Sequence, residues 1–502
     1  MRTNDDHRGQ AAAGWRSRRA LALPALALAL ALSGYLLNRQ PARHATPTPV
    51  PTVALAPTAA PTPAAPPRPV AYATPTAVPR PSAAGTPAPS PAPSPPPGLG
   101  DAGELLYIGA LDGQAGIIAV RADGGSRRLI APGPYQAVFW SPDGRRFAAP
   151  DQADGRNRLT LFDADGTQSA RAVFPAGPWQ APVWSRDSRT VAIAGFAGDA
   201  PGTPGRARFV AWLVSDADAV PVSLGASTWP WQWSTTGRLA LTVSAGEGTN
   251  GDTAAPGPGQ LWTVDETGHD VRRLADGAYL PIGWSLDGAT LYALGDMSPG
   301  PSTAQPTPRL TTLLAIDAQT GRQRPLVAAR DLAARVGLAT PAGAPFWFDA
   351  GALAPTGDRF ALEAATPGPD GTVERALIVL GPGDAARRAY DERAPTDAPP
   401  LAPSWSPDGG RLAWKTWNVA VSTGVRVYDL AGGGLLAVGE SAYFGPPDWY
   451  PAEDPERAGP QWSPDGRWIA FSRLGRLSVA AATPPPALWT LAPGGLWPAW
   501  RP

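Results

Sequence analysis

The chain has 502 residues with 42 basic and 42 acidic side chains, so its formal net charge at neutral pH is zero. Lys415 is the only lysine, and no basic stripe points to a nucleic-acid or anionic-lipid partner. The absence of cysteine excludes disulfides, thiol chemistry and a lipid-modified N-terminal cysteine.

An apolar segment at residues 20–38 is the first predicted element. Residues 20–37 would span about 27 Å as a helix, close to the roughly 30 Å hydrocarbon core of a membrane. Five arginines lie in the preceding basic tail, residues 1–19, and the positive-inside rule keeps this tail cytoplasmic. We therefore expect an uncleaved transmembrane signal anchor in a single-pass protein of the cell membrane, with the rest of the chain extracytoplasmic. The alternative is secretion after signal-peptide cleavage near Ser33.

Residues 39–99 differ in composition from everything that follows. Proline, alanine and threonine dominate this segment, and such a composition cannot bury enough apolar area to fold. We expect a disordered stalk. In a polyproline II conformation, residues 41–97 would reach up to roughly 180 Å, enough to hold a folded domain away from the membrane.

The sequence Trp-Ser-Pro-Asp-Gly recurs along residues 100–502. It is intact at residues 140–144, 405–409 and 462–466. Degenerate copies begin at Trp184, Trp233, Trp284 and Leu353, and successive copies lie 44 to 69 residues apart. Periods of this length indicate a solenoid, a propeller or another array of repeats.

Each repeat contains four short strand-like runs separated by turn residues. In the repeat at Tyr135, residues 135–140 are the predicted first strand, and residues 146–150, 158–162 and 170–174 are the second, third and fourth. Between the first two strands, proline presets the backbone of a type I turn and glycine supplies the left-handed residue that reverses the chain. The pattern predicts four-stranded antiparallel blades in an all-β fold.

The first and last repeats are each incomplete. Residues 105–109, 116–120 and 127–130 predict a second, third and fourth strand without an innermost one. Residues 495–502 contain a first strand and its Trp500, so the C-terminal strand is expected to complete the first blade and close the ring. This gives eight blades. Seven is the alternative, if the repeat at Leu353 or the short last repeat forms no blade.

These repeats resemble TolB-like and WD40-like β-propeller repeats, and also the N-terminal propeller of dipeptidyl peptidase IV-type proteins. The resemblance covers residues 100–502 and rests on the intact and degenerate motifs above. It implies a propeller of the kind found in periplasmic binding scaffolds and enzyme accessory domains. No hydrolase domain is expected after Pro502.

The tryptophan that opens each motif recurs at one position of every repeat, as packing between neighbouring repeats requires. Truncation of such a buried residue typically costs roughly 3–5 kcal/mol. We therefore interpret the following residues as structural blade anchors: Trp140, Trp184, Trp233, Trp284, Trp405, Trp462 and Trp500.

Catalytic chemistry has little support in the sequence. Only three histidines exist, and His269 alone lies within the repeats. The paired aspartates at residues 163/165 and 216/218 lack the rest of a calcium-binding loop. We predict no catalytic residue, no metal ligand and no cofactor. An enzyme that acts on glycans or peptides with carboxylates at the channel mouth is kept as an alternative.

Long loops define the predicted binding face, because the tight turns occupy the opposite face. Aromatic and charged residues concentrate in the loop at 440–460, and the predicted binding residues are Tyr443, Phe444, Trp449, Tyr450 and Arg457. Other long loops are expected at 198–208, 245–259, 298–308 and 326–346. We predict a noncatalytic scaffold whose partner is a protein or a cell-envelope glycan. A noncatalytic carbohydrate-binding module is the further alternative.

Overall fold

The fold was analysed in a computed structural model, which describes residues 95–177, 179–200, 203–244, 259–296, 309–338, 344–368, 372–395, 403–418, 422–441, 460–473 and 476–502. All described residues belong to the second of the two units into which the chain divides, Ser90–Pro502. The expected anchor at 20–38 and nearly all of the expected stalk lie outside them. Within the described ranges, no helix is long and apolar enough to cross a membrane.

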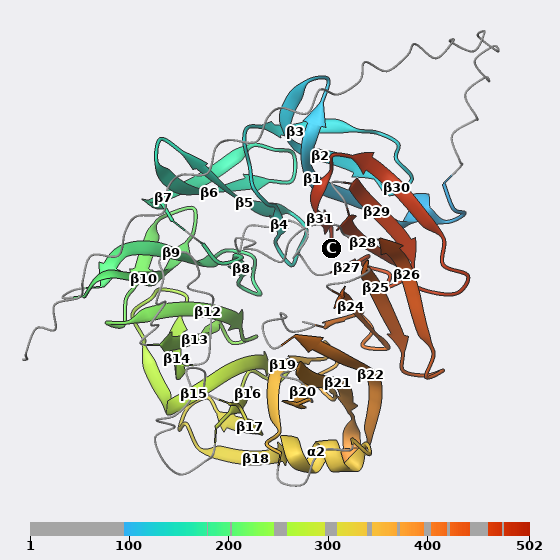
Figure 1. The fold of residues 1–502 in the computed structure, drawn as a ribbon. Coiled ribbons are helices and arrows are strands. Elements are labelled where there is room, and N and C mark those ends of the chain that lie inside the picture. Colours follow the sequence, from blue (N-terminus) through green and yellow to red (C-terminus); the bar gives the residue numbers. More distant parts are fainter. Residues whose placement is uncertain are drawn as a thin grey trace, which may run out of the picture. The chain divides into compact units, whose positions relative to one another are not determined.

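The second unit is built almost wholly of antiparallel strands, which stand in sheets around a common centre (Figure 1). Sheet A comprises β31 (Leu496–Trp500), β1 (Glu104–Leu111), β2 (Gln114–Arg121) and β3 (Arg128–Pro132). Sheet B comprises β4 (Phe139–Trp140), β5 (Arg146–Ala153), β6 (Arg156–Asp163) and β7 (Gln168–Pro175). Sheet C comprises β8 (Val183–Trp184), β9 (Val191–Ala200), β10 (Thr203–Val214) and β11 (Ala219–Val222).

Three further four-stranded sheets follow along the chain. Sheet E comprises β19 (Trp347–Leu353), β20 (Phe360–Pro367), β21 (Thr372–Leu380) and β22 (Ala386–Pro395). Sheet F comprises β23 (Ser404–Trp405), β24 (Arg411–Asn418), β25 (Ser422–Asp429) and β26 (Leu435–Ser441). Sheet G comprises β27 (Gln461–Trp462), β28 (Trp468–Arg473), β29 (Arg476–Ala481) and β30 (Leu488–Pro493).

Sheet D, between sheets C and E, has seven strands because one strand serves two repeats. Its strands are β12 (Ser227–Trp233), β13 (Arg238–Ser244), β14 (Gly259–Asp265), β15 (Arg272–Trp284), β16 (Thr290–Gly295), β17 (Thr312–Asp317) and β18 (Gln323–Ala328). Along β15, Tyr279 pairs with Gly259 on one side and with Gly295 on the other. The start of β15 is thus the fourth strand of the first half of sheet D, and its end is the first strand of the second half.

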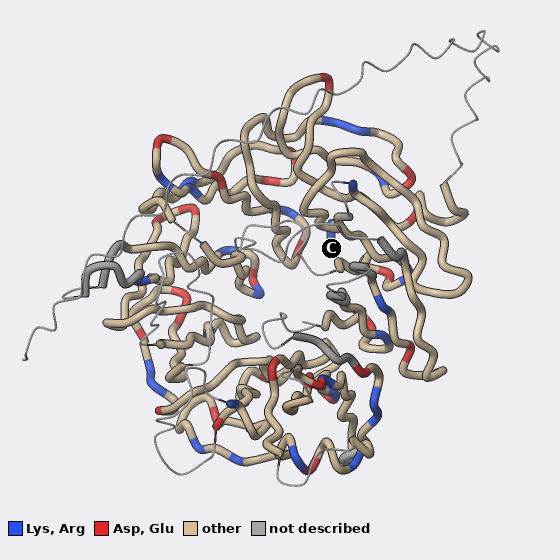
Figure 2. Tube along the Cα trace, in the orientation of Figure 1, with Lys and Arg blue, Asp and Glu red and all other residues tan. Residues whose placement is uncertain are grey.

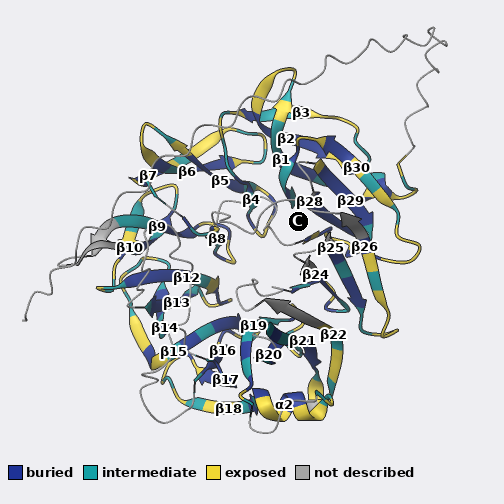
Figure 3. Ribbon diagram, in the orientation of Figure 1, coloured by how far each residue is buried: buried dark blue, intermediate teal, exposed yellow. Residues whose placement is uncertain are grey.

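Neighbouring sheets pack face to face, since successive side chains of a strand point to opposite faces. On β1, Leu105 packs in a buried cluster with Leu477 of sheet G, whereas Leu106 packs in another with Phe147 of sheet B. Among the described residues, buried clusters join eight successive pairs of neighbours in this way, with two clusters between C and D: A to B, B to C, C to D, the two halves of D, D to E, E to F, F to G and G to A. Figure 3 shows the resulting burial, with most exposed positions on outer strands and turns.

The last strand completes the sheet of the first strands, as predicted. β31 pairs with β1 through Leu105 with Trp500 and Leu106 with Ala499. The amide of Arg501 donates a 2.9 Å hydrogen bond to the carbonyl of Glu104, which extends this contact to the penultimate residue. Charged residues of both signs are interspersed around the unit (Figure 2), as the balanced composition requires.

Three expectations about local structure were wrong. The predicted loop at 198–208 is largely the hairpin of β9 and β10, which continue their pairing past two register shifts. The predicted loop at 326–346 contains the end of β18 and the helix α2 (Ala329–Arg335), whose Leu332 and Ala333 are buried. The predicted first strand at 135–140 is interrupted: only β4 pairs regularly with β5, and Tyr135 forms a separate antiparallel bridge to Asp151.

Candidate functional site

The five predicted binding residues, Tyr443, Phe444, Trp449, Tyr450 and Arg457, all lie outside the described residues. Their role therefore stays a prediction. The candidate site that the described residues form is a different one, a cavity bordered by innermost strands at the centre of the unit. Its geometry follows from the repeated motif, whose residues fix the ends of these strands.

The serine of the motif explains why the tight turns keep their shape. The buried hydroxyl of Ser406 donates to the carboxylate of Asp408 at 2.5 Å and accepts the amide of Arg411 at 2.9 Å. Ser141 makes the same pair of bonds, to Asp143 at 2.7 Å and from Arg146 at 3.0 Å. One hydroxyl thereby closes each hairpin, and the strand that precedes it ends at a fixed place.

These bonds also set the charge state of the turn aspartates. The hydrogen bond from Ser406, followed by that from the amide of Gly410, holds the pKa of Asp408 below its ordinary value. The pKa of Asp287 is lowered in the same way, by Ser285 and then by an amide. The carboxylates of these turns are therefore structural acceptors in the charged form.

The anchor tryptophans join each innermost strand to the one before it. Each indole Nε1 donates to the backbone carbonyl of the residue that precedes the previous anchor position. The bonds are Trp140 to Ala499 (3.2 Å), Trp184 to Phe139 (3.0 Å), Trp233 to Val183 (3.1 Å), Trp284 to Gln232 (3.0 Å), Trp405 to Ala352 (3.1 Å), Trp462 to Ser404 (3.2 Å) and Trp500 to Gln461 (3.1 Å). The same residues thus border the centre and hold its wall together.

One link of this series differs, because Leu353 stands where the other repeats have tryptophan. A leucine cannot donate to the carbonyl of Gly283, the corresponding residue of the previous repeat. Instead the two strands lie very close together, since a Cβ atom built on Gly283 would stand 2.4 Å from the Cβ of Leu353. Glycine at 283 permits an apolar contact where the hydrogen bond is missing.

The central cavity has a volume of about 720 Å³ and is lined by the inner strands of sheets A, B, C, G and the first half of D. That volume lies within the usual range for small-molecule sites, about 300–1,000 Å³. Its lining residues are mostly aromatic or apolar: Val138, Phe139, Trp140, Pro142, Ala181, Pro182, Val183, Trp184, Trp231, Trp233, Trp462, Trp497, Pro498, Ala499, Trp500 and Pro502. Gln232, Gln461 and Arg186 complete it.

Trp497 has an unusual backbone. Its φ of 51° lies in the left-handed region, which bulky side chains rarely adopt. It stands next to a register shift in the pairing of β31 with β1, and its amide donates to the hydroxyl of Ser472 at 3.2 Å. The half-buried ring lies 6.0 Å from the ring of Phe139 between centroids. Such a bulge re-aims a side chain, here toward the cavity.

No aspartate or glutamate is among the residues that line the cavity, so its described wall holds no pair of acidic side chains for the alternative enzymatic mechanism. The buried acids lie elsewhere. In sheet E, the side chain of Glu363 is fully buried and lies 3.2 Å from Arg375 Nε, which also contacts Asp349 at 3.1 Å. A guanidinium between two carboxyl groups pairs with both of them and offsets part of the cost of their burial.

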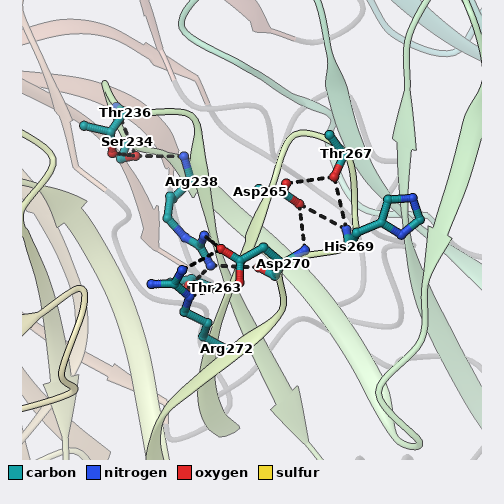
Figure 4. Close-up of polar contacts among 9 residues, drawn as sticks. All are labelled: Ser234, Thr236, Arg238, Thr263, Asp265, Thr267, His269, Asp270 and Arg272. Atoms are coloured by element: carbon teal, nitrogen blue, oxygen red, sulfur yellow. Dashed lines mark hydrogen bonds and ion pairs between the residues drawn. The ribbon is translucent and has the colours of Figure 1, made fainter.

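Figure 4 shows the surroundings of His269, the one histidine of the repeats. Its backbone amide donates to Asp265 at 3.0 Å, and its exposed ring points away from the polar network. Asp270 instead pairs with Arg238 and Arg272, at 2.6 and 2.7 Å. Hydrogen bonds from Arg272 and then Arg238 hold the pKa of Asp270 below its ordinary value. This network closes the turn between β14 and β15.

The paired aspartates also act within turns. Asp165 accepts the amide of Thr167 at 2.8 Å, Asp218 accepts that of Ala219 at 2.7 Å, and Asp216 pairs with Arg146. In the ranges that the structure describes, no group of three or more histidine or acidic side chains could hold a metal ion.

Five residues that line the cavity were not among the predicted binding residues: Phe139, Val183, Gln232, Gln461 and Ala499. A signal for them was present, because each directly precedes an anchor tryptophan that also lines the cavity. The position before each anchor is therefore where the repeats differ in what they offer to a ligand.

Neither a protein-family model nor a curated protein matches the sequence. Solved structures do match. A prolyl endopeptidase structure is 14% identical and covers 76% of this chain and 53% of its own, with a TM-score of 0.45. The chain thus spans about half the length of that enzyme.

Two propellers also match. The Cps50 (Swd1) β-propeller domain of Myceliophteria thermophila is 13% identical, covering 68% of this chain and 93% of its own, with a TM-score of 0.38. A putative TolB from Agrobacterium tumefaciens is 15% identical, covering 59% and 91%, with a TM-score of 0.34. The chain is similar in structure to TolB-like and WD40-like β-propellers, the resemblance that its repeats indicated.

Proposed function

We propose that the chain is a noncatalytic binding scaffold, built as a β-propeller of eight blades that the C-terminal strand closes into a ring. Two features support the count of eight: the strand β15 serves two repeats, and buried clusters join eight successive pairs of neighbours around the unit. Seven indole hydrogen bonds make the frame rigid, and a rigid frame is what recognition by loops and cavities requires.

The central cavity is the observation that carries this proposal. Its wall combines aromatic rings with two amide side chains and contains Arg186 as its charged side chain. Concave surfaces of this composition bind ligands, since apolar contact supplies affinity and a few polar groups supply orientation. Acid–base chemistry needs titratable groups that face the reacting atoms.

The finer parts of the proposal rest on the sequence. We propose that residues 20–38 tether the chain to the membrane, that residues 39–99 are a spacer, and that the propeller of residues 100–502 is extracytoplasmic. A protein or cell-envelope partner would contact the long-loop face at Tyr443, Phe444, Trp449, Tyr450 and Arg457. Aromatic residues beside charges are typical of such interfaces.

A cross-linking pull-down from the producing cell's envelope tests this function. The bait is the full chain in detergent, compared with the double variant Trp449→Ala/Tyr450→Ala and with the cavity variant Gln232→Ala. A partner lost only from the double variant supports binding at the long-loop face. A ligand lost only from the cavity variant supports a scaffold that binds at its centre. If all three baits retain the same material, neither surface is the binding site.

A further inference from the structure

We infer that the central cavity binds a neutral saccharide of one or two rings, held between the aromatic side chains of Phe139 and Trp497 and the amides of Gln232 and Gln461. This inference rests on the proposed function and names the class of its ligand.

The apolar surface comes from Phe139 and Trp497 rather than from the anchors. One face of the Trp140 indole is occupied by the guanidinium of Arg501, 5.4 Å from the ring centroid, and Arg146 lies 5.7 Å from that of Trp184. The anchors also use their Nε1 atoms in the wall itself. Phe139 and Trp497 are half-buried, line the cavity and contact each other, so together they form an apolar platform.

The backbone of Trp497 supports a role in binding. Residues held in sparsely populated regions of φ and ψ cost about 1–3 kcal/mol and concentrate at ligand sites. Glycine or asparagine would adopt a φ of 51° more readily than tryptophan. The ring lines the cavity and packs against the buried cluster between sheets B and C, which holds it in place as a stacking residue requires.

Two amides stand at opposite ends of the cavity wall. Gln461 belongs to β27 and Gln232 to β12, with the strands β31, β4 and β8 between them in the order of the sheets. Both glutamines are exposed. A glutamine side chain offers two donors and an acceptor, which matches sugar hydroxyls that both donate and accept. The platform therefore lies between polar groups at two sides, as a flat ring with polar edges demands.

The side chains of the wall offer little to a charged ligand. None of them is acidic, so a cation would find no acidic side chain to pair with, and Arg186, the one charged side chain, is exposed in the turn after β8. An anion could pair only at that exposed position, and a charge buried deeper in the cavity without a partner is costly. A volume of about 720 Å³ holds a small ligand rather than a folded partner.

The test uses the full chain in detergent and an array of neutral, acidic and amino oligosaccharides, followed by titration calorimetry with the neutral sugar that binds best. Trp497→Asn removes the ring and leaves a residue that suits the backbone, so this variant is expected to fold. We expect about tenfold weaker binding for Trp497→Asn, and weaker binding for Gln232→Ala. Matched controls are Trp489→Ala, a half-buried tryptophan of β30, and Gln319→Ala, an exposed glutamine, neither of which lines the cavity.

Two outcomes overturn the inference. In the first, the array retains no neutral saccharide, or the affinity for the sugar is the same in the cavity variants as in the control variants. In the second, a proline-rich peptide binds in a manner that depends on Trp497 while sugars do not, since aromatic grooves also bind polyproline II segments. The second outcome would leave the proposed scaffold function intact and change only its ligand. Melting curves of every variant separate loss of binding from loss of fold.

Discussion

At the scale of single residues, the indole N–H of each anchor tryptophan links neighbouring repeats. It donates across the gap between two inner strands, so every anchor contributes a directional bond as well as buried area. Because a net hydrogen bond contributes only about 1 kcal/mol, the two contributions can be separated by a substitution that keeps the ring. The repeated Trp-Ser-Pro-Asp-Gly sequence thus encodes contact with the previous repeat and closure of its own hairpin.

Replacement of Trp284 by phenylalanine removes the donor to Gln232 and keeps an aromatic side chain. We expect the free energy of unfolding to fall by about 0.5–1.5 kcal/mol, since the carbonyl of Gln232 loses a partly buried hydrogen bond. Urea unfolding measures the change. Trp489→Phe is the control, because its Nε1 is buried without a hydrogen-bond partner among the described residues. Equal losses in the two variants would mean that the bond contributes nothing.

Gly283 offers a second test at this scale. Gly283→Ala places a methyl group 2.4 Å from Leu353 Cβ, and such overpacking typically costs about 1–3 kcal/mol. Gly434→Ala is the matched control, because a Cβ atom there meets nothing within 4 Å. A thermal melt in which both alanine variants match the parent would show that the two inner strands can move apart at no cost.

How much the sequence reveals differs between residues. The anchors and turns could be predicted because Trp, Pro and Gly recur at fixed positions, and each has a local physical role. The cavity could not, because the residue before the anchor varies from repeat to repeat, as Phe139, Val183 and Gln232 show, and Trp497 belongs to no recurring position. Their common location emerges only when five inner strands are placed side by side.

At the scale of elements, the turn between the first two strands of a repeat couples stability to pH. Asp287 and Asp408 have pKa values held below the ordinary value by bonds from the motif serine and a backbone amide. A carboxyl group with a depressed pKa in the folded state contributes stability above its unfolded pKa, about 3.9, and loses it as pH falls through the folded value.

We therefore expect the variant Asp287→Asn/Asp408→Asn to be less stable than the parent at pH 7, with a difference that shrinks below about pH 4. Urea midpoints at several pH values between 3 and 7 measure this. A difference that stays constant over that range would mean that the two carboxylates are not linked to folding.

Elements that the sequence mispredicted share one cause, the influence of tertiary contacts on short segments. The helix α2 has only seven residues, too short for a helical period to stand out, and it forms because Leu332 and Ala333 pack into the cluster between sheets D and E. Likewise, β9 and β10 extend beyond the expected strands because each supplies the other with hydrogen-bond partners. In both cases the stabilising contacts come from residues outside the segment, so the sequence of the segment alone does not predict them.

At the scale of the whole molecule, the strand β31 joins the last repeat to the first. Deletion of residues 496–502 removes its pairing with β1 and the buried indole of Trp500. We expect a loss of at least the roughly 3–5 kcal/mol that truncation of a buried tryptophan costs. Trp500→Leu, which copies the natural leucine at 353, should be milder because the strand stays. An unchanged melting temperature after the deletion would refute closure by this strand.

Membrane attachment is the other prediction at this scale. The full chain should stay with membranes after alkaline carbonate extraction, because about 18 apolar residues suffice to span the bilayer. Replacement of residues 20–37 by glycine and serine should release it. If the parent itself is recovered in the soluble fraction with a new N-terminus near Gly34, the segment is a cleaved signal peptide.

The pairing of β31 with β1 also decides how the propeller responds to force. The two ends of the described chain meet in sheet A, where the partner residues are Leu105 with Trp500, Leu106 with Ala499 and Ile108 with Leu496. A pull that separates these ends loads this short ladder before any other sheet. Single-molecule stretching between residues 98 and 502 should therefore record an early low-force step that opens sheet A, followed by the loss of sheets one by one from the opened edge.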